Sequence, residues 1–180
     1  MSDARLEEVL PAAQQGEAWA LRALYEELAP RVHAYLRARG ASEPEDLTSE
    51  VFVTVFPRLP SVTGGAPGLR TFTFSVAHAR LVDDLRRRSR REPAASYDPD
   101  TDPRTSASAE DEGLDRVQTD QVRRLLDALV PDQRDVLTLR LLADLTVEQV
   151  ADTLGKSTGA VKQLQRRGLI ALRRMLEGPS

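Results

Sequence analysis

Apolar residues recur along the chain with the three- and four-residue spacing of amphipathic helices, and no stretch alternates for long enough to predict a strand. The best example is Glu17–Arg39, where one helical face is apolar. Its apolar positions are Leu21, Leu24, Tyr25, Leu28, Val32 and Leu36. Pro30 falls inside this segment, so we expect a kink or an interruption there, because proline lacks an amide donor. The pattern predicts an all-α protein.

Three more helices are predicted in the first half of the chain. Leu6–Gln14 is short, whereas Pro44–Phe56 has one apolar face and acidic residues in its first turn, which suit the helix dipole. A loop with the sequence SVTGGAPG follows. The last of the three helices runs from about Leu69 to Arg90. Its candidate core positions are Phe72, Val76, Ala79 and Leu85.

The second half of the chain predicts four helices. The first covers Leu114–Leu129 and is amphipathic. Pro131 opens the next one, since a proline costs little in a first turn. The last two helices lie in Leu145–Arg174, the segment whose residue types say most about a ligand.

Leu145–Arg174 reads as a short helix, a tight turn and a basic second helix. Thr146 fits an N-cap, Gly155 a helix stop, and Ser157 or Thr158 the cap of the second helix. The buried stripe of the second helix is Val161, Leu164, Leu172 and either Gly168 or Leu169. Its other face carries Lys162, Gln163, Arg166, Arg167 and Arg173. This arrangement is typical of a DNA-binding helix-turn-helix, although a solvated face in an ordinary bundle would give the same pattern.

The net charge of −3 hides an uneven distribution. Glu92–Asp115 carries a net charge of −7, whereas the parts before and after it carry +1 and +3. This segment also holds three prolines and almost nothing apolar, so it cannot bury enough surface to offset the entropy of ordering. We therefore expect two small helical domains, residues 1–91 and 115–180, joined by an acidic flexible linker at residues 92–114.

Composition excludes several kinds of site. The chain has no cysteine, which removes disulfides, thiolate metal sites and thiol catalysis. His33 and His78 are 45 positions apart, and no glycine-rich loop continues into a phosphate-binding GK[ST] sequence. We expect no enzyme activity, no cofactor, no metal and no small-molecule substrate. The absence of a long apolar run and of a signal-peptide core predicts a cytoplasmic protein without membrane insertion.

The predicted helix near residues 69–90 ends in the arginine run Arg86, Arg87, Arg88, Arg90 and Arg91. These cations could contact phosphates or could simply be solvated at the negative end of the helix dipole. Upstream of them, Phe72, Phe74, His78 and Arg80 place rings beside cations. Such a surface suits single-stranded nucleic acid, because bases stack on rings while cations neutralise the backbone. We expect Phe72 in the core and Phe74 as the stacking platform.

The sequence EDLTSEVF, Glu45–Phe52, is acidic on one side and apolar on the other. By itself this pattern indicates only a surface helix. Beside a DNA-binding domain, it could instead dock a protein partner.

Five motifs, in order, resemble those of bacterial RNA polymerase sigma factors of the sigma-70 family, in the extracytoplasmic-function (ECF) subfamily. They are DLTSEVF, FTFSVAHARLVDDLRRR, the acidic linker, LVPDQRDVLTLRLLADLTVEQVADTLG and STGAVKQLQRRGLIALRRML. The resemblance spans Glu17 to Leu176 and implies an alternative sigma factor with region 2 in the first domain and region 4 in the second. The partners it implies are core RNA polymerase, promoter DNA and an anti-sigma factor.

The resemblance implies three sets of contact residues. The clamp of the polymerase's largest subunit would bind Asp46, Leu47, Glu50, Val51 and Phe52. The −10 element would be opened and read as a single strand by Phe74, His78, Arg80, Arg86, Arg87 and Arg88. The −35 element would be read in the major groove by Ser157, Thr158, Lys162, Gln163, Arg166 and Arg167.

The chain also departs from the family pattern. The unusual positions are Ser49, Phe72, Thr73, Ala79 and Leu164, where the family commonly has Gln, Trp, Leu, Asn and Arg. Lys162 and Arg167 match, so Gln163 and Arg166 are our candidates for base and phosphate contact in a −35 sequence of its own. The alternative function is a helix-turn-helix regulator that acts on duplex DNA without being a polymerase subunit.

Overall fold

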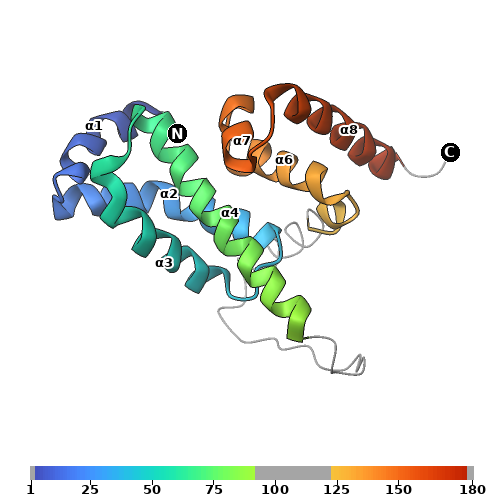
Figure 1. The fold of residues 1–180 in the computed structure, drawn as a ribbon, viewed down its shortest axis with the longest axis horizontal. Coiled ribbons are helices and arrows are strands. Elements are labelled where there is room, and N and C mark those ends of the chain that lie inside the picture. Colours follow the sequence, from blue (N-terminus) through green and yellow to red (C-terminus); the bar gives the residue numbers. More distant parts are fainter. Residues whose placement is uncertain (1–2, 92–122, 178–180) are drawn as a thin grey trace.

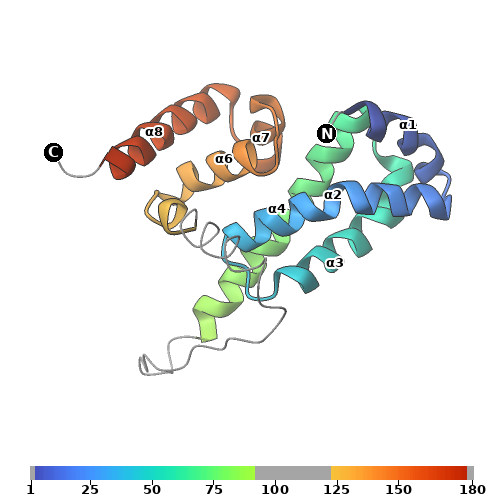
Figure 2. The same cartoon turned by 180° about the vertical axis from the view of Figure 1, so that it is seen from behind.

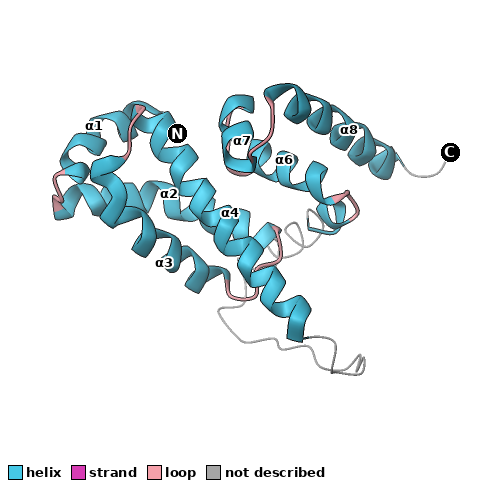
Figure 3. Ribbon diagram, viewed as in Figure 1, coloured by secondary structure: helices cyan, strands magenta, loops and turns pink. Residues whose placement is uncertain are grey.

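The structure, a computed structural model, describes residues 3–91 and 123–177, and all regular structure in these ranges is helical (Figure 3). The all-α prediction is confirmed. The first group of helices is α1 (Asp3–Gln14), α2 (Ala18–Ala38), α3 (Pro44–Val55), the 3-10 helix η1 (Phe56–Ser61) and α4 (Gly65–Arg91). The second group is α6 (Pro131–Leu141), α7 (Val147–Leu154) and α8 (Thr158–Glu177).

The predicted linker, residues 92–114, and the first part of the predicted helix Leu114–Leu129 lie outside the described residues. Of that helix, residues 123–127 are described and are helical. None of the described helices is long and apolar enough to cross a membrane.

The first group packs around α2, whose predicted apolar face is buried at four of its six positions, whereas Leu21 is half-buried and Tyr25 is 40% exposed. Leu24, Leu28, Val32 and Leu36 are each at most 1% exposed. The helix continues through Pro30 instead of stopping there, so the expected interruption is wrong. Burial of the apolar face on both sides of Pro30 outweighs the loss of one backbone hydrogen bond.

Helix α4 begins at Gly65, four residues before the predicted start. The Glu7 carboxylate of α1 accepts a hydrogen bond from the Ala66 amide at 2.8 Å and so caps the first turn of α4. An added side chain at Gly65 would meet that carboxylate, which explains the glycine there. The cap comes from a residue 59 positions away, and no local pattern could have predicted it.

The buried face of α4 is not the predicted one. Leu69, Phe74, Ala77 and Leu81 are fully buried. The four predicted core positions of this helix, Phe72, Val76, Ala79 and Leu85, are half-buried or, at Ala79, exposed. The reason is that α4 contacts α1 and α3 on one side and α7 on another, so no single apolar stripe marks its interior.

The second group follows its sequence pattern closely. The Thr146 hydroxyl accepts from the Gln149 amide at 3.2 Å, and the Gln149 side chain accepts from the Thr146 amide at 2.7 Å, which is a complete capping box. Gly155 ends α7 in the left-handed conformation, with φ of 62°. The Ser157 hydroxyl accepts from the Ala160 amide at 3.2 Å and caps the start of α8.

Helix α8 crosses α6 at Gly168, which is buried. A Cβ at this position would lie 2.7 Å from Leu137 Cδ1, so only glycine lets the two helices approach this closely. Leu169, the other predicted candidate for this stripe position, is 43% exposed.

The two groups of helices touch each other. Helix α7 lies beside the first half of α4, and α6 lies beside α2, while the far end of α4 projects away from the second group (Figures 1 and 2). Helix α8 lies on the side of the second group that faces away from α4.

Candidate nucleic-acid interface

The first half of α8 presents all six residues predicted for −35 contact. Each of them is exposed. They are Ser157, Thr158, Lys162, Gln163, Arg166 and Arg167. Within residues 3–91 and 123–177, neither Arg166 nor Arg167 has a carboxylate within ion-pair distance. These cations are therefore available to phosphates, with polar side chains at the helix start.

The turn between α6 and α7 is held by Arg140 at the end of α6, whose guanidinium donates to the Leu145 carbonyl just before α7. A hollow of about 480 Å³ lies between this region and α8. Lys162 and Arg166 line it together with the half-exposed side chains of Leu169 and Ile170. The basic face of α8 therefore continues into an apolar strip.

The predicted stacking platform on α4 is wrong. Phe74 is fully buried and packs edge-on against Tyr35, with 5.8 Å between ring centroids. It therefore cannot stack on a base without unpacking the core. Phe72, which we expected in the core, is instead only half-buried at the surface of the helix.

Phe72 borders a hollow of about 510 Å³ beside the loop that precedes α4. The other lining residues are Ser61, Val62, Thr63, Gly68, Thr71, Ser75 and, from α7, Asp152. One aromatic ring and several hydroxyl groups are chemically suited to an unpaired base, which needs a stacking surface and hydrogen-bond partners. No sequence pattern predicted this hollow, because its loop and the helix α7 are brought together only by the fold.

His78 lies on α4 and contacts Tyr35 of α2. Its Nδ1 is 2.9 Å from the Tyr35 hydroxyl, and its ring is half-buried. Burial lowers the pKa of His78, and Arg39 lowers it further, while Asp135 of α6 acts in the opposite direction. Burial also disfavours the charged form of Tyr35, because it raises the pKa of the hydroxyl. Both shifts favour the neutral forms, so His78 is a poor source of positive charge for DNA in this arrangement.

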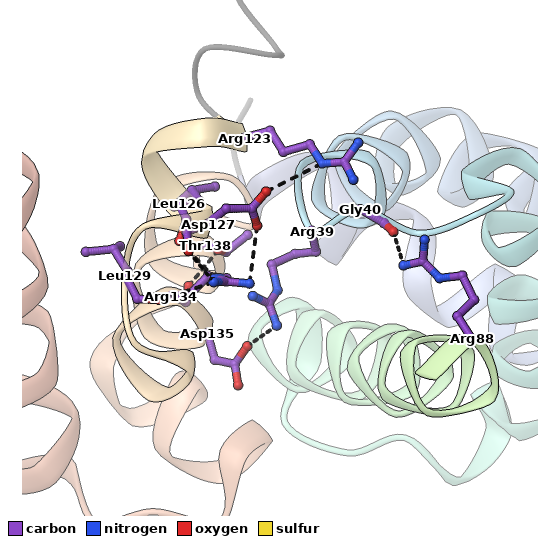
Figure 4. A network of polar contacts seen from close by, with 10 residues as sticks. All are labelled: Arg39, Gly40, Arg88, Arg123, Leu126, Asp127, Leu129, Arg134, Asp135 and Thr138. Atoms are coloured by element: carbon purple, nitrogen blue, oxygen red, sulfur yellow. Dashed lines mark hydrogen bonds and ion pairs between the residues drawn. The ribbon is translucent and has the colours of Figure 1, made fainter. Parts of the chain in front are cut away.

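The cations of α4 are partly engaged within the protein. Arg80 lies 3.7 Å from Glu50 Oε2 and donates to the Thr54 hydroxyl at 3.1 Å, so it ties α4 to α3. Arg88 donates to the Gly40 carbonyl (Figure 4). It also lies 3.7 Å from Asp84 Oδ2. Arg86 and Arg87 are exposed. The −10 set therefore contains two exposed cations, two engaged ones, one neutral ring and one core residue.

Asp84 anchors this end of α4. It is 7% exposed and accepts hydrogen bonds from the Ser42 amide at 3.1 Å and from the Ser42 hydroxyl at 2.7 Å. Burial alone would raise the pKa of Asp84, but these two bonds and the charges of Arg88 and Arg87 bring it below its ordinary value. The carboxylate therefore stays ionised and holds Arg88.

The predicted polymerase-binding set divides by exposure. Asp46 and Glu50 are exposed on α3. Leu47, Val51 and Phe52 are at most 5% exposed and belong to the core beneath them. A partner could touch only the two acids directly. Val53, which is 74% exposed on the same helix, is a further candidate that sequence reasoning missed, although a valine off the buried stripe was a usable signal.

No group of three or more His, Asp or Glu side chains in the described ranges is arranged to hold a metal ion.

The comparisons with known families match both groups of helices. Residues 24–91 match the family described as Sigma-70 region 2, and residues 125–174 match Sigma-70, region 4. The match to region 2 argues against the alternative function, a helix-turn-helix regulator that acts on duplex DNA without being a polymerase subunit. The match to region 4 contains the whole helix-turn-helix.

Two curated relatives extend the match over most of the chain. ShbA of Streptomyces griseus, an ECF RNA polymerase sigma factor, is 32% identical over 176 residues, which cover 92% of each protein. BldN of Streptomyces coelicolor, also an ECF RNA polymerase sigma factor, is 31% identical over 96% of this chain, but the match covers only 66% of its own length.

Two solved structures share the fold. CnrH, in complex with the cytosolic domain of CnrY, has a TM-score of 0.73 at 18% identity and covers 97% of this chain and 99% of its own. The sigma factor RpoE of Bartonella quintana, in complex with the anti-sigma factor NepR, has a TM-score of 0.65 at 17% identity and covers 88% and 98%.

Sigma factors are non-catalytic initiation factors that direct RNA polymerase to particular promoters. The matches to regions 2 and 4, and the relatives that align over nearly the full length, leave one family for this sequence. The chain belongs to the ECF sigma factors of bacterial RNA polymerase.

Proposed function

We propose that this sigma factor divides promoter recognition between its two groups of helices, with α8 on the −35 duplex and α4 on the unpaired −10 strand. Residues 1–91 and 115–180 are then the two working units, and residues 92–114 connect them. The observation that carries this proposal is the basic first half of α8, where six candidate residues are exposed beyond a fully capped turn. This is the geometry by which recognition helices enter a major groove.

On α4, the proposed strand-binding surface consists of Phe72, the hollow beside it, and the exposed cations Arg86 and Arg87. Phe72 replaces Phe74 as the stacking ring, because Phe74 is needed in the core. The chemistry requires no covalent step. Stacking and cation contacts made only with the unpaired strand would favour the open form of the duplex.

On α3, we propose that Asp46 and Glu50 bind the clamp of the largest polymerase subunit, with Val53 beside them. Two exposed acids around an apolar side chain suit a basic, partly apolar partner surface. The buried residues Leu47, Val51 and Phe52 would support this helix face without touching the partner. Since polymerase and promoter DNA are the proposed partners, we propose that the protein acts in the cytoplasm.

We also propose an anti-sigma factor as a partner. Bartonella RpoE is in complex with the anti-sigma factor NepR. In this chain, exposed apolar side chains occur on both groups of helices, including Trp19 at 59%, Leu141 at 61% and Leu176 at 65%. Surfaces of this kind fit a protein partner.

Run-off transcription tests the central proposal. Purified chain and core RNA polymerase are incubated with genomic fragments, and transcripts are mapped. We expect initiation at a small set of shared −35 and −10 sequences, with none from either component alone. Failure of the chain to bind core polymerase would refute the proposal.

A further inference from the structure

Lysine is rare in this chain and occurs only in the helix-turn-helix. Among the 25 basic residues, Lys156 and Lys162 are lysines and all the others are arginines. An arginine stays protonated, whereas a lysine can release its proton, and its neutral amine can then be acylated. An acylating reagent therefore has two side-chain amines to choose between, and both lie in the part of the chain that is proposed to read the −35 duplex.

The two lysines differ in their surroundings. Lys156, in the turn between α7 and α8, has its Nζ 3.1 Å from Asp132 Oδ2, and its side chain is 30% exposed. Lys162 is exposed on the first half of α8, and no carboxylate in residues 3–91 and 123–177 lies within ion-pair distance of it. An ion pair must open before the Lys156 amine can react. Lys162 is therefore the more accessible nucleophile.

One acid of α7 acts on Lys162 from beyond ion-pair distance. Hydrogen bonds at the start of α7, first from the Glu148 backbone and then from Thr146, lower the pKa of the Glu148 carboxyl, and the charges of Lys162 and Arg140 lower it further. A carboxylate with a lowered pKa is a weak base. Glu148 therefore adds to the electrostatic surroundings of the amine without taking its proton.

Lys162 also lines the hollow of about 480 Å³ beside α8, together with the guanidinium groups of Arg140 and Arg166. Guanidinium donors suit phosphate oxygens, and Arg140 has donors left beyond the one that bonds to the Leu145 carbonyl. The remaining lining residues are mostly apolar and suit a short acyl chain; they are Val147, Gln165, Leu169 and Ile170. The hollow thus combines an amine, two cations for an anion and an apolar wall.

We propose that Lys162 is a site of acylation by acyl phosphates that bind in this hollow. The ammonium of Lys162 first gives one proton to water. The neutral Nζ then attacks the acyl carbon, so that an N–C bond forms and the C–O bond to the phosphate breaks. The phosphate leaves with the electron pair and takes the second proton of the amine. The step needs no oxidant or reductant.

Acylation of Lys162 would switch off the −35 reader, a consequence that rests on the proposed function of α8. The modification removes one positive charge and adds bulk to the helix face that is proposed to enter the major groove. One phosphate contact fewer should reduce the slope of log affinity against log salt by about 0.9. Promoter use would then fall as the supply of acyl phosphate rises.

Acetyl phosphate is the probe that tests the site. The full-length chain is incubated with it, and acetylation at each lysine is followed by peptide mass mapping. We expect Lys162 to react at least about threefold faster than Lys156. Equal rates at the two lysines would overturn the inference.

An uncharged reagent separates binding in the hollow from simple exposure. Arg166→Ala should slow the reaction of Lys162 with acetyl phosphate at least about threefold, but not its reaction with acetic anhydride, which offers no phosphate to the arginine. Arg173→Ala is the matched control, because Arg173 is paired with Glu177 and does not line the hollow. The same change with both reagents, or with neither, would overturn the proposed binding of the acyl phosphate.

Fluorescence anisotropy with a −35 duplex tests the consequence. Acetylated wild-type chain should bind at least about fivefold more weakly than untreated chain. Binding by Lys162→Arg, which cannot be acylated at this position, should not respond to acetyl phosphate. Equal binding before and after acetylation of Lys162 would refute the switch. If the untreated chain fails to bind the duplex, the proposed function of α8 fails, while the mass data still decide whether Lys162 is the acylation site.

Discussion

The two proposed DNA-reading surfaces differ in how ready they are for DNA. Helix α8 presents an exposed basic face on a turn whose caps are complete. Helix α4 presents a face that α7 partly covers, with its single histidine half-buried against Tyr35 and two of its arginines engaged inside the protein. A duplex reader needs only a rigid helix that fits an existing groove. Single-stranded DNA is present only after the promoter duplex has opened. In this structure α7 partly covers the surface that is proposed to bind it.

The largest expected effect separates the two phenylalanines of α4. Phe74→Ala should lower the free energy of unfolding by about 3–5 kcal/mol, because it removes a fully buried ring from the core. Phe72→Ala should leave stability nearly unchanged and instead reduce the affinity of the holoenzyme for single-stranded −10 DNA by about 1–3 kcal/mol. Denaturant unfolding and fluorescence anisotropy measure the two effects. Equal loss of stability in both variants would contradict the assignment.

Charge reversal on α3 should separate polymerase binding from duplex binding. Asp46→Arg places a cation where a basic partner is expected, which should cost several kcal/mol of affinity for core polymerase. Binding of the free chain to duplex −35 DNA should not change, because α8 is remote from α3. Glu8→Arg, on α1, makes the same charge change at an exposed site away from α3 and is the control. Loss of both activities in Asp46→Arg would refute the division between the groups.

A smaller effect is expected on the recognition helix. Arg166→Ala should weaken binding to the −35 duplex and reduce the slope of log affinity against log salt by about 0.9, the value for one phosphate contact in B-DNA. Arg173→Ala is the control, since that arginine is paired with Glu177 at 2.6 Å beyond the proposed contact surface. A salt titration by anisotropy measures both. An unchanged slope in Arg166→Ala would show that this residue does not contact a phosphate.

The smallest effect concerns Asp84, the carboxylate that holds Arg88 near the end of α4. Ser42→Ala removes the hydroxyl donor to Asp84, keeps the backbone amide donor, and should lower the free energy of unfolding by about 1 kcal/mol at neutral pH. The pKa of Asp84 is lowered in the folded state, so its stabilisation is present above the ordinary value of 3.8 and is lost as the pH falls through the lowered one. The difference between Ser42→Ala and wild type should therefore shrink below pH 4. Ser89→Ala, at an exposed site on α4, should show no such difference.

Sequence reasoning succeeded where the deciding groups are close neighbours in the chain. The caps of the helix-turn-helix were predictable because each one acts within four residues of its own position. The structure confirms Thr146, Gly155 and Ser157 in these roles. The all-α class also followed from periodicity, and the structure confirms it.

Prediction from the sequence failed where the deciding groups are far apart along the chain. The start of α4 depends on Glu7, and the choice between Phe72 and Phe74 depends on Tyr35 and on the docking of α7. A helix that is covered from several sides has no single apolar stripe, so its pattern cannot tell a core ring from a surface ring. The three buried residues of the predicted polymerase-binding set reflect the same difficulty, because a motif does not distinguish the residues that touch from those that support.

One side chain serves both the helix-turn-helix and its contact with α4. The oxygen of the Gln149 amide completes the capping box of α7, while its nitrogen bonds to the Pro67 carbonyl of α4. Loss of the bond to α4 would leave the capping box untouched, because the two bonds are made by different atoms of the same amide. The fold of the helix-turn-helix therefore does not depend on its contact with α4 at this residue.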